Sequence, residues 1–287
     1  RGTVARCAEM LWLATVLLLL VVQGVGAVKR EDFKTCEQAA FCNRHREFAK
    51  NVTTGHASGK TKAAYAVVEG SVRMEQHKLT ATVQNEDEVP LALEVTFMAS
   101  GIMRVRMQEE KPLVARFDDT QKYVLRNEGV ALEYADGAAL HYATERTGGG
   151  LTHVVSYKGN TTFSMRMTER PWTVAMTVDG RTAVQLNTRG LFRFEHLRAR
   201  PEGDAPAGEW EEQFRTWTDT KPRGPEAFGL DIGFTGCEHV YGIPEHSSPL
   251  SLRTTRGGKG AYDQPYRLYN LDVFEYEIDN PMALYGS

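Results

Sequence analysis

The chain has 287 residues, of which 41% are hydrophobic and 25% are charged, and its formal net charge is -3. This length and composition are typical of one large or two modest globular domains, and they exclude a disordered or collagen-like chain. The small negative charge gives no electrostatic basis for binding nucleic acid, so we expect no nucleic-acid partner.

The first 27 residues have the pattern of a secretory signal peptide. Arg1 and Arg6 precede an apolar run at residues 11–22, and small residues follow it up to Ala27. Because the run is shorter than the roughly 20 residues that span a bilayer, we predict cleavage after Ala27. An uncleaved anchor is the alternative. No second apolar run of that length follows, so we expect no membrane span in the mature chain. The first methionine is Met10, so the true start is Met10 or lies upstream.

Cysteines come next along the chain. Cys36 and Cys42 lie close together, and an oxidising lumen favours a disulfide between them that contributes roughly 2 kcal/mol. Residues 35–38 (TCEQ) also resemble a capping box that would start a helix. A helix through both cysteines would separate their Cα atoms by about 9 Å, which is too far for a disulfide. A zinc site that adds His45 fits no common spacing, so we predict no metal. Cys237 is left over, and we expect it to be buried and inert.

Residues 28–62 are predicted to be an N-terminal extension. Its second half, residues 51–62, is polar and rich in Gly, Thr and Ser, which favours a turn-like passage. Two acceptor sequons fit a luminal compartment, and they predict glycosylation at Asn51 and Asn160.

From residue 63 onward the hydrophobic period is mostly two, which predicts strands with one buried face. The alternation is clearest in residues 79–83, 91–97, 103–107 and 172–178. Other strands are expected in residues 130–142 and 152–157, with Gly148, Gly149 and Gly150 as a turn between them, and from Phe192 to Phe194 with Arg193 and Glu195 facing away. Asp179-Gly180 follows the strand at 172–178 and predicts a type I' hairpin turn into residues 182–186.

A dozen short strands without long helical patterns indicate an all-β fold, an antiparallel β-sandwich over residues 63–287. Residues 198–208 carry no apolar periodicity, so they are expected to form a flexible surface insertion rather than a domain boundary.

The last part of the chain crowds aromatic rings, carboxylates and amides into turn-rich sequence. Aromatic faces stack on sugar rings while carboxylates and amides bind hydroxyls, so this composition favours a carbohydrate ligand. The blocks concerned are 241–246 (YGIPEH), 265–274 (PYRLYNLDVF) and 280–287 (NPMALYGS).

These blocks resemble the N-terminal region of luminal α-glucosidases of glycoside hydrolase family 31. Further blocks match in the family's order: 32–38 (DFKTCEQ), 189–196 (RGLFRFEH), 210–214 (WEEQF), 221–225 (KPRGP) and 229–231 (GLD). The resemblance implies a sandwich of the galactose-mutarotase type, removal of α-linked glucose from N-glycans in the endoplasmic-reticulum lumen, and a non-catalytic beta subunit as partner. No cofactor is implied.

The resemblance also divides the chemistry between this chain and a following domain. Retaining hydrolysis needs two carboxyl groups about 5 to 5.5 Å apart, and in this family both come from a (β/α)8 barrel after the sandwich. No segment here matches the nucleophile motif, so we expect the catalytic residues to lie beyond residue 287 and the chain to be a non-catalytic fragment. By the resemblance, Asp272 and Phe274 line the substrate pocket, and the alternative is that Asp272 caps a turn and Phe274 is core.

Three other patterns receive structural interpretations. Glu238, His239, Glu245 and His246 surround a predicted tight turn, because their spacing matches no metal site. The glycine-rich residues 257–260 lack the context of a phosphate loop. Trp210 and Trp217 are expected in the core or at the rim rather than on a sugar-binding platform.

Two rival functions remain open from the sequence. A free-standing secreted carbohydrate-binding sandwich would bind a glucoside without any further domain. A purely structural or subunit-docking domain would leave substrate binding unchanged when Asp272 is replaced.

Overall fold

The computed structural model describes residues 34–54, 64–86, 89–116, 133–148, 150–158, 162–204, 208–244, 246, 249–256 and 264–266. The chain divides into two compact units, one of Arg1–Gln38 with Glu238–Ser287 and the other of Ala39–Cys237. The described helices and strands all belong to the second unit.

Strands dominate the second unit. The described elements are α2 Ala40–Thr54, β1 Ala66–Val67, β2 Arg73–Glu75, β3 Lys78–Gln84, β4 Leu91–Phe97, β5 Met103–Glu109, the 3-10 helix Gly137–Ala139, β6 Leu140–Thr147, β7 Gly150–Lys158, β8 Thr162–Thr168, β9 Thr173–Val178, β10 Arg181–Leu186, β11 Arg193–Phe194, β12 Glu211–Phe214, β13 Trp217–Thr220, β14 Phe228–Gly229 and β15 Ile232–Phe234.

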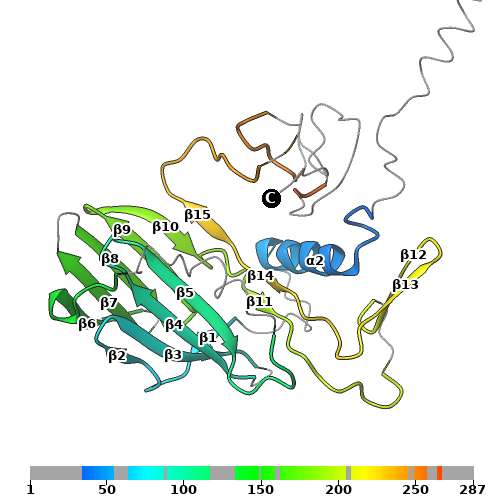
Figure 1. Cartoon of the computed structure of the whole chain (residues 1–287), viewed down its shortest axis with the longest axis horizontal. Coiled ribbons are helices and arrows are strands. Elements are labelled where there is room, and N and C mark those ends of the chain that lie inside the picture. The colour runs from blue at the N-terminus through cyan, green and yellow to red at the C-terminus, as the bar shows by residue number, and fades with distance from the viewer. Residues whose placement is uncertain are drawn as a thin grey trace, which may run out of the picture. The chain divides into compact units, whose positions relative to one another are not determined.

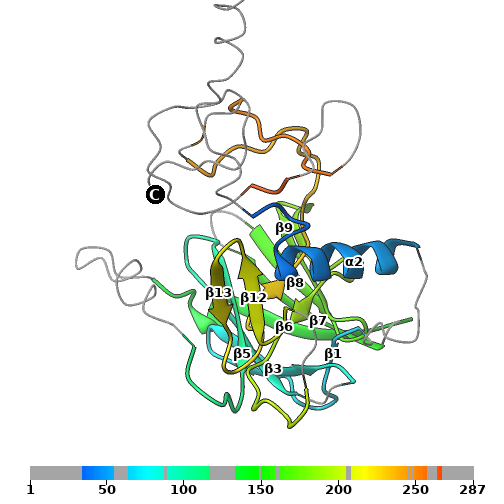
Figure 2. The same cartoon turned by 90° about the vertical axis from the view of Figure 1, so that its right-hand side faces the viewer.

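Two antiparallel sheets form the sandwich. The first runs β1-β3-β4-β5 with β2 paired to β3, and the second runs β15-β10-β9-β8-β7-β6. The first sheet is drawn mainly in cyan and the second mainly in green, and their faces oppose each other (Figure 1). Turned by 90°, the view brings α2 and the β12–β13 hairpin to the near side (Figure 2). The predicted antiparallel all-β fold is confirmed.

The core lies between the two sheets because each strand turns one set of alternate side chains inward. In β3, Leu79 and Val83 are fully buried, and the polar residues between them are partly exposed. β8 contributes Phe163, Met165 and Met167 from the opposite sheet to the same core. The predicted period of two is therefore correct in these strands.

The predicted hairpin between β9 and β10 is also present. Arg181 pairs with Val178 across the turn. Asp179 and Gly180 both have positive φ values, 47° and 79°, as a type I' turn requires. Gly180 fits because it has no Cβ to oppose this backbone conformation.

The helix α2 occupies residues 40–54, within the predicted N-terminal extension 28–62. From the sequence, a helix is expected here only as the alternative that the capping box suggests, and residues 51–54 are expected to be turn-like. The capping-box residues lie in a turn before it: the Thr35 N–H donates to the Gln38 side chain at 2.8 Å, and the Gln38 N–H donates to the Thr35 carbonyl at 3.1 Å. The helix begins only at Ala40, so Cys36 is not helical.

The turn before α2 removes the geometric objection to a disulfide at Cys36 and Cys42. Because a turn precedes the helix, the 9 Å separation that would oppose a disulfide does not arise. Cys36 and Cys42 are both disulfide-bonded. Their mutual pairing stays a prediction. Cys237 is free and exposed, so the expectation that it is buried was wrong. It follows β15 in a turn, where its N–H donates to the Phe234 carbonyl at 3.4 Å.

Several predicted features lie outside the described residues: the signal peptide 1–27, the sequon at Asn160 and the glycine-rich residues 257–260. The described helix is neither long nor apolar enough to cross a membrane. The proposed division at residues 27 and 62 stays a prediction.

Candidate functional site

The two residues predicted to line a substrate pocket, Asp272 and Phe274, lie outside the described residues. The structure therefore does not place them together or apart. Asn51, the first predicted glycosylation site, is partly exposed in the last turn of α2. The hydroxyl of Thr53, the third sequon residue, donates to the Ala49 carbonyl at 2.8 Å.

Residues 238–266 belong to the first compact unit, and their described part is held by local contacts. The Arg253 N–H donates to the Tyr266 hydroxyl at 3.0 Å, and the Leu252 N–H donates to the Val240 carbonyl at 2.8 Å. The ring of His246 lies 5.8 Å from that of Tyr266. These contacts fix aromatic groups next to one another in the segment that precedes the predicted substrate loop.

The histidines of this segment make hydrogen bonds within the protein. His239 Nδ1 lies 3.3 Å from the Ser251 hydroxyl, and His246 Nε2 lies 3.2 Å from the Gly242 carbonyl. Glu245 lies outside the described residues. No group of three metal-ligating side chains occurs among the residues that the structure describes.

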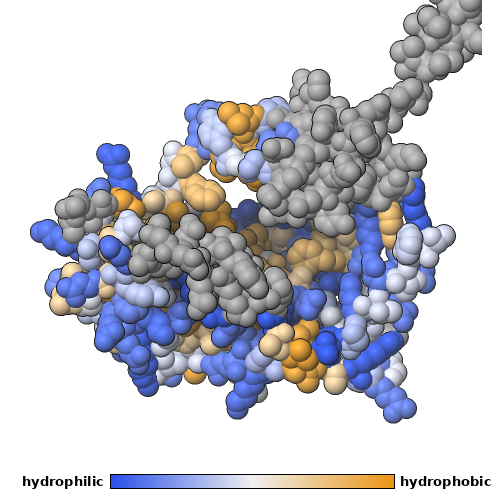
Figure 3. Space-filling model, viewed as in Figure 1, coloured by the Kyte–Doolittle hydropathy of each residue, from blue (hydrophilic) through white to orange (hydrophobic). Residues whose placement is uncertain are grey.

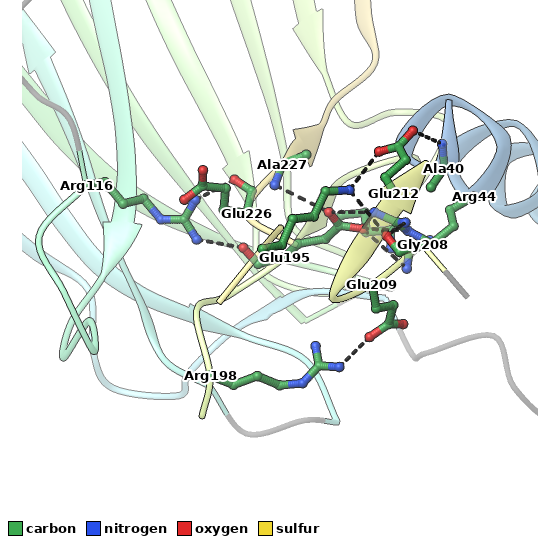
Figure 4. Close-up of polar contacts among 12 residues, drawn as sticks. Ala40, Arg44, Arg116, Glu195, Arg198, Gly208, Glu209, Glu212, Glu226 and Ala227 are labelled. Carbon is green, nitrogen blue, oxygen red and sulfur yellow. Dashed lines mark hydrogen bonds and ion pairs between the residues drawn. The ribbon is translucent and has the colours of Figure 1, made fainter. Parts of the chain in front are cut away.

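A cluster of polar groups in the second unit is centred on Glu195, directly after β11. Its carboxylate accepts hydrogen bonds from Arg44 Nε at 3.1 Å and Arg44 Nη2 at 3.2 Å. It also accepts one from the Ala227 N–H at 3.3 Å. Only 6% of the Glu195 side chain is exposed. Glu195 therefore links α2 to the segment after β11, because the Arg44 side chain extends from the helix to its carboxylate (Figure 4).

Arg116 extends this cluster on the other side of Glu195 (Figure 4). It donates to the Glu109 carboxylate at 2.8 Å, to the Glu195 carbonyl at 2.6 Å and to the Glu226 carbonyl at 2.5 Å. Glu109 also accepts from the Leu197 N–H at 3.1 Å. One guanidinium thus joins the end of β5 to two neighbouring segments.

The β12–β13 hairpin and the residues on either side of it contact the same region. Lys221 donates to the Glu212 carboxylate at 2.8 Å and to the Gly208 carbonyl at 3.2 Å. Glu212 in turn accepts from the Ala40 N–H at 3.0 Å, which satisfies a backbone donor at the start of α2. The cluster can hold elements together, and its carboxylates are already occupied by cations and N–H groups.

From the sequence, Glu195 is expected to face away from the buried side of its strand. Its side chain does point away from the sandwich core, but α2 covers that side. Arg44, Glu109 and Arg116 were not singled out from the sequence. Arg116 and Glu109 are seven positions apart, but their other partners and those of Arg44 are distant along the chain. No local signal could have identified them.

The two tryptophans in this region differ. Trp210 is 3% exposed, and the guanidinium of Arg198 lies 4.7 Å from its ring. Its Nε1 donates to Asp204 at 3.2 Å. Trp217 is 74% exposed at the start of β13. Trp210 therefore has the expected core position, and the rim position of Trp217 stays a prediction.

Two of the sequence blocks in the second unit are explained by backbone hydrogen bonds. Asp231 accepts from the Arg189 and Leu191 N–H groups at 2.8 and 3.0 Å. Asn187 is buried with φ 59°, accepts from the Phe192 N–H and donates to the Trp172 carbonyl. These side chains shape the 187–192 turn, which is a structural task.

An open groove of about 1170 Å³ lies between the two sheets of the second unit. Half-buried aliphatic and aromatic side chains of β5, β9, β10 and β15 line it. Most of the coloured surface in Figure 3 is hydrophilic, and hydrophobic surface gathers in a few patches. Charged side chains also line the groove, among them Arg106, Glu110 and Arg223.

Comparison with known proteins gives consistent matches. The sequence profile described as "Glycosyl hydrolase 31 N-terminal galactose mutarotase-like domain" matches residues 92–287. "Neutral alpha-glucosidase AB" of Homo sapiens is 33% identical over 312 residues, which cover 96% of this chain and 30% of that protein. The chain therefore spans about a third of the length of such relatives.

Solved structures match as well. A DNJ-bound crystal structure of a glucosidase II alpha subunit has a TM-score of 0.76 and 35% identity, over 91% of this chain and 29% of that one. The heterodimeric complex of ER glucosidase II, formed by the catalytic subunit and the binding domain of the regulatory subunit, has a TM-score of 0.76 and 33% identity, over 88% of this chain and 28% of that one.

Proposed function

The chain belongs to glycoside hydrolase family 31, and from this we propose that it is the N-terminal, substrate-lining domain of a luminal α-glucosidase. The observation that carries the proposal is the similarity to α-glucosidases along nearly the whole chain, in sequence and in fold. In the whole enzyme, the reaction is retaining hydrolysis of α-linked glucose from N-glycans.

The bond-breaking carboxyl groups are proposed to lie in a barrel beyond residue 287. One carboxylate attacks the anomeric carbon, and the other protonates the leaving oxygen. This chemistry needs no cofactor. The chain alone is therefore proposed to lack catalysis and to contribute shape and hydrogen bonds to the substrate pocket.

Asp272 and Phe274 are the residues to which we assign that contribution. Asp272 accepts hydrogen bonds from sugar hydroxyls, and Phe274 supplies an aromatic wall for the ring. The packed aromatic and polar groups in the described part of residues 238–266 support this proposal, because they hold the preceding segment by local contacts.

The compartment is proposed to be the endoplasmic-reticulum lumen. A predicted signal peptide, bonded cysteines at Cys36 and Cys42, and partly exposed Asn51 in a sequon are all compatible with an oxidising, glycosylating lumen. Asn160 is the second proposed glycosylation site.

A non-catalytic beta subunit is the proposed protein partner. The support is that a similar solved structure is a heterodimer with the binding domain of a regulatory subunit. A free-standing carbohydrate-binding sandwich is the alternative, favoured only by the aromatic composition of the last segment.

The test is replacement of Asp272 in the full-length enzyme. Charge-assisted hydrogen bonds are worth about 1.5–3 kcal/mol, so Asp272→Asn should lower kcat/KM on an α-glucoside by about 10- to 100-fold. Asp219→Asn, an exposed carboxylate on β13, is the matched control and should leave kcat/KM unchanged.

Two results would contradict the proposal. Equal kcat/KM in Asp272→Asn and the control would remove the substrate-lining role. Turnover of a glucoside by purified residues 28–287, or tight glucoside binding by that piece, would favour a self-sufficient domain.

A further inference from the structure

A second, smaller pocket lies between α2 and β11, and Phe192 and Phe194 line both it and the groove between the sheets. Its volume is about 390 Å³, which is within the range of small-molecule sites. Phe48 and Val52 of α2 form one wall, and Tyr65, Phe192 and Phe194 form much of the rest. The walls are thus mainly aromatic and aliphatic.

One cation in this pocket lacks a carboxylate of its own. Arg193 lines the pocket, and only 26% of its side chain is exposed. Its nearest carboxylate oxygen is Glu195 Oε1 at 3.8 Å, which is too long for a good hydrogen bond. That carboxylate already accepts hydrogen bonds from Nε and Nη2 of Arg44. Arg193 otherwise lies over the ring of Phe48 at 5.7 Å.

The other guanidinium that lines this pocket is neutralised. Arg198 pairs with Glu209, which also lines the pocket, and it lies 3.6 Å from Asp204. The carboxylates near the pocket are therefore committed to Arg44 and Arg198. Among the described groups, Arg193 therefore shares the Glu195 carboxylate with Arg44, which lies closer to it.

His45 lies near the same guanidinium. Its pKa is lowered to about 4, first because the ring is buried and then because of the charge of Arg193, while Glu195 acts in the opposite direction. Its Nε2 atom is buried and has no hydrogen-bond partner in the described structure. A neutral imidazole adds no second positive charge beside Arg193.

We propose that this pocket binds a small organic anion with an aromatic or alicyclic body, whose carboxylate or sulfonate pairs with Arg193. The planar guanidinium offers five N–H donors in a fork that matches such a group, and most of them are unused. The aromatic walls receive the apolar body. This site is separate from the proposed glucosidase function and does not depend on it.

The probe is 1-anilinonaphthalene-8-sulfonate, an aromatic sulfonate whose fluorescence rises in an apolar site, titrated into the full chain. Arg193→Gln removes the charge and keeps the length of the side chain. It should weaken binding by about 10-fold or more, the effect expected for loss of a charge-assisted hydrogen bond. Arg189→Gln, at an exposed position, is the matched control and should bind as the unaltered chain does.

A neutral analogue, N-phenyl-1-naphthylamine, separates this pocket from the apolar groove. Its affinity should be the same in Arg193→Gln and Arg189→Gln, because it lacks the anionic group. Arg193→Lys retains the charge and should bind the sulfonate better than Arg193→Gln. Equal sulfonate affinity in Arg193→Gln and Arg189→Gln, or equal losses for both probes, would overturn the proposal.

Discussion

Replacing Glu195 with Gln should destabilise the protein far more than replacing an equally well-paired glutamate at the surface. Gln keeps the shape of the side chain and removes its charge. Arg44 and Arg193 then lose their shared counter-ion at side-chain exposures of 18% and 26%. The Gln amide also presents two donors where Arg44 and the Ala227 N–H need acceptors.

The expected magnitude follows from burial. Breaking a fully buried ion pair by removing one partner costs about 3–5 kcal/mol, because the remaining charge is left without compensation. Arg44 and Arg193 keep some contact with water, which reduces that cost. We expect Glu195→Gln to lower the free energy of unfolding by about 2–3 kcal/mol.

Glu145 supplies the control. It pairs with Arg166 at 2.5 Å, but the two side chains are 49% and 42% exposed. Arg166 holds the pKa of Glu145 below its ordinary value through a side-chain hydrogen bond and through its charge. Because water replaces the pair readily, Glu145→Gln should leave the unfolding midpoint nearly unchanged.

The assay is urea unfolding followed by circular dichroism, with the slope m held to be equal for all variants. A double-mutant cycle of Glu195→Gln with Arg44→Met isolates their interaction. Equal midpoints for Glu195→Gln and Glu145→Gln would refute the argument that burial of the cluster decides its energetic importance.

Three further predictions test single contacts. The pKa of His45 is about 4 in the folded chain against the ordinary 6.5, so the unfolded chain binds more protons between these pH values, and the contribution of His45 to stability should fall as pH drops from 6.5 to 4. The urea midpoints at pH 7 and pH 4.5 should therefore differ less in His45→Gln than in the unaltered chain. An unchanged difference would contradict this prediction. A Cβ at Gly229 would lie 2.5 Å from two His45 ring atoms, so Gly229→Ala should cost about 1–3 kcal/mol, whereas Gly148→Ala, with open space around it, should cost little in the same unfolding assay. Leu93 is 1% exposed in the core, so Leu93→Ala should cost about 2–5 kcal/mol in thermal unfolding, and a loss below 1 kcal/mol would show a loosely packed site.

Much of the sandwich could be predicted because the alternation of apolar and polar residues along each strand shows which side chains are buried. In β3 and β4, every second residue enters one core, so the apolar positions repeat with the period of the backbone. The type I' turn at Asp179-Gly180 could also be predicted, because few other dipeptides adopt two positive φ values.

Other features could not be predicted because they depend on partners far along the chain. α2 is fixed by Arg44 with Glu195 and by the Ala40 N–H with Glu212, contacts that span more than 150 positions. Its sequence has a weak apolar face and follows a competing cysteine pattern. We therefore predict an N-terminal extension here from the sequence, with the helix only as an alternative.

Glu195 illustrates the limit of periodicity most clearly. Alternation correctly turned Phe194 toward the core and Glu195 away from it. It could not report that a helix and a guanidinium cover that outer side. A period of two describes which side a residue faces, and it carries no information on what packs there.

The amino-acid sequence alone determined the strand pattern, the hairpin turn, the luminal signals and the family resemblance, because each of these depends on residues that are close together in the sequence. The tertiary structure decided the placement of α2, the burial of Glu195 and the sharing of its carboxylate between Arg44 and Arg193. Each of these depends on charges and surfaces that folding brings together from distant parts of the chain, where removal of water sets their energies.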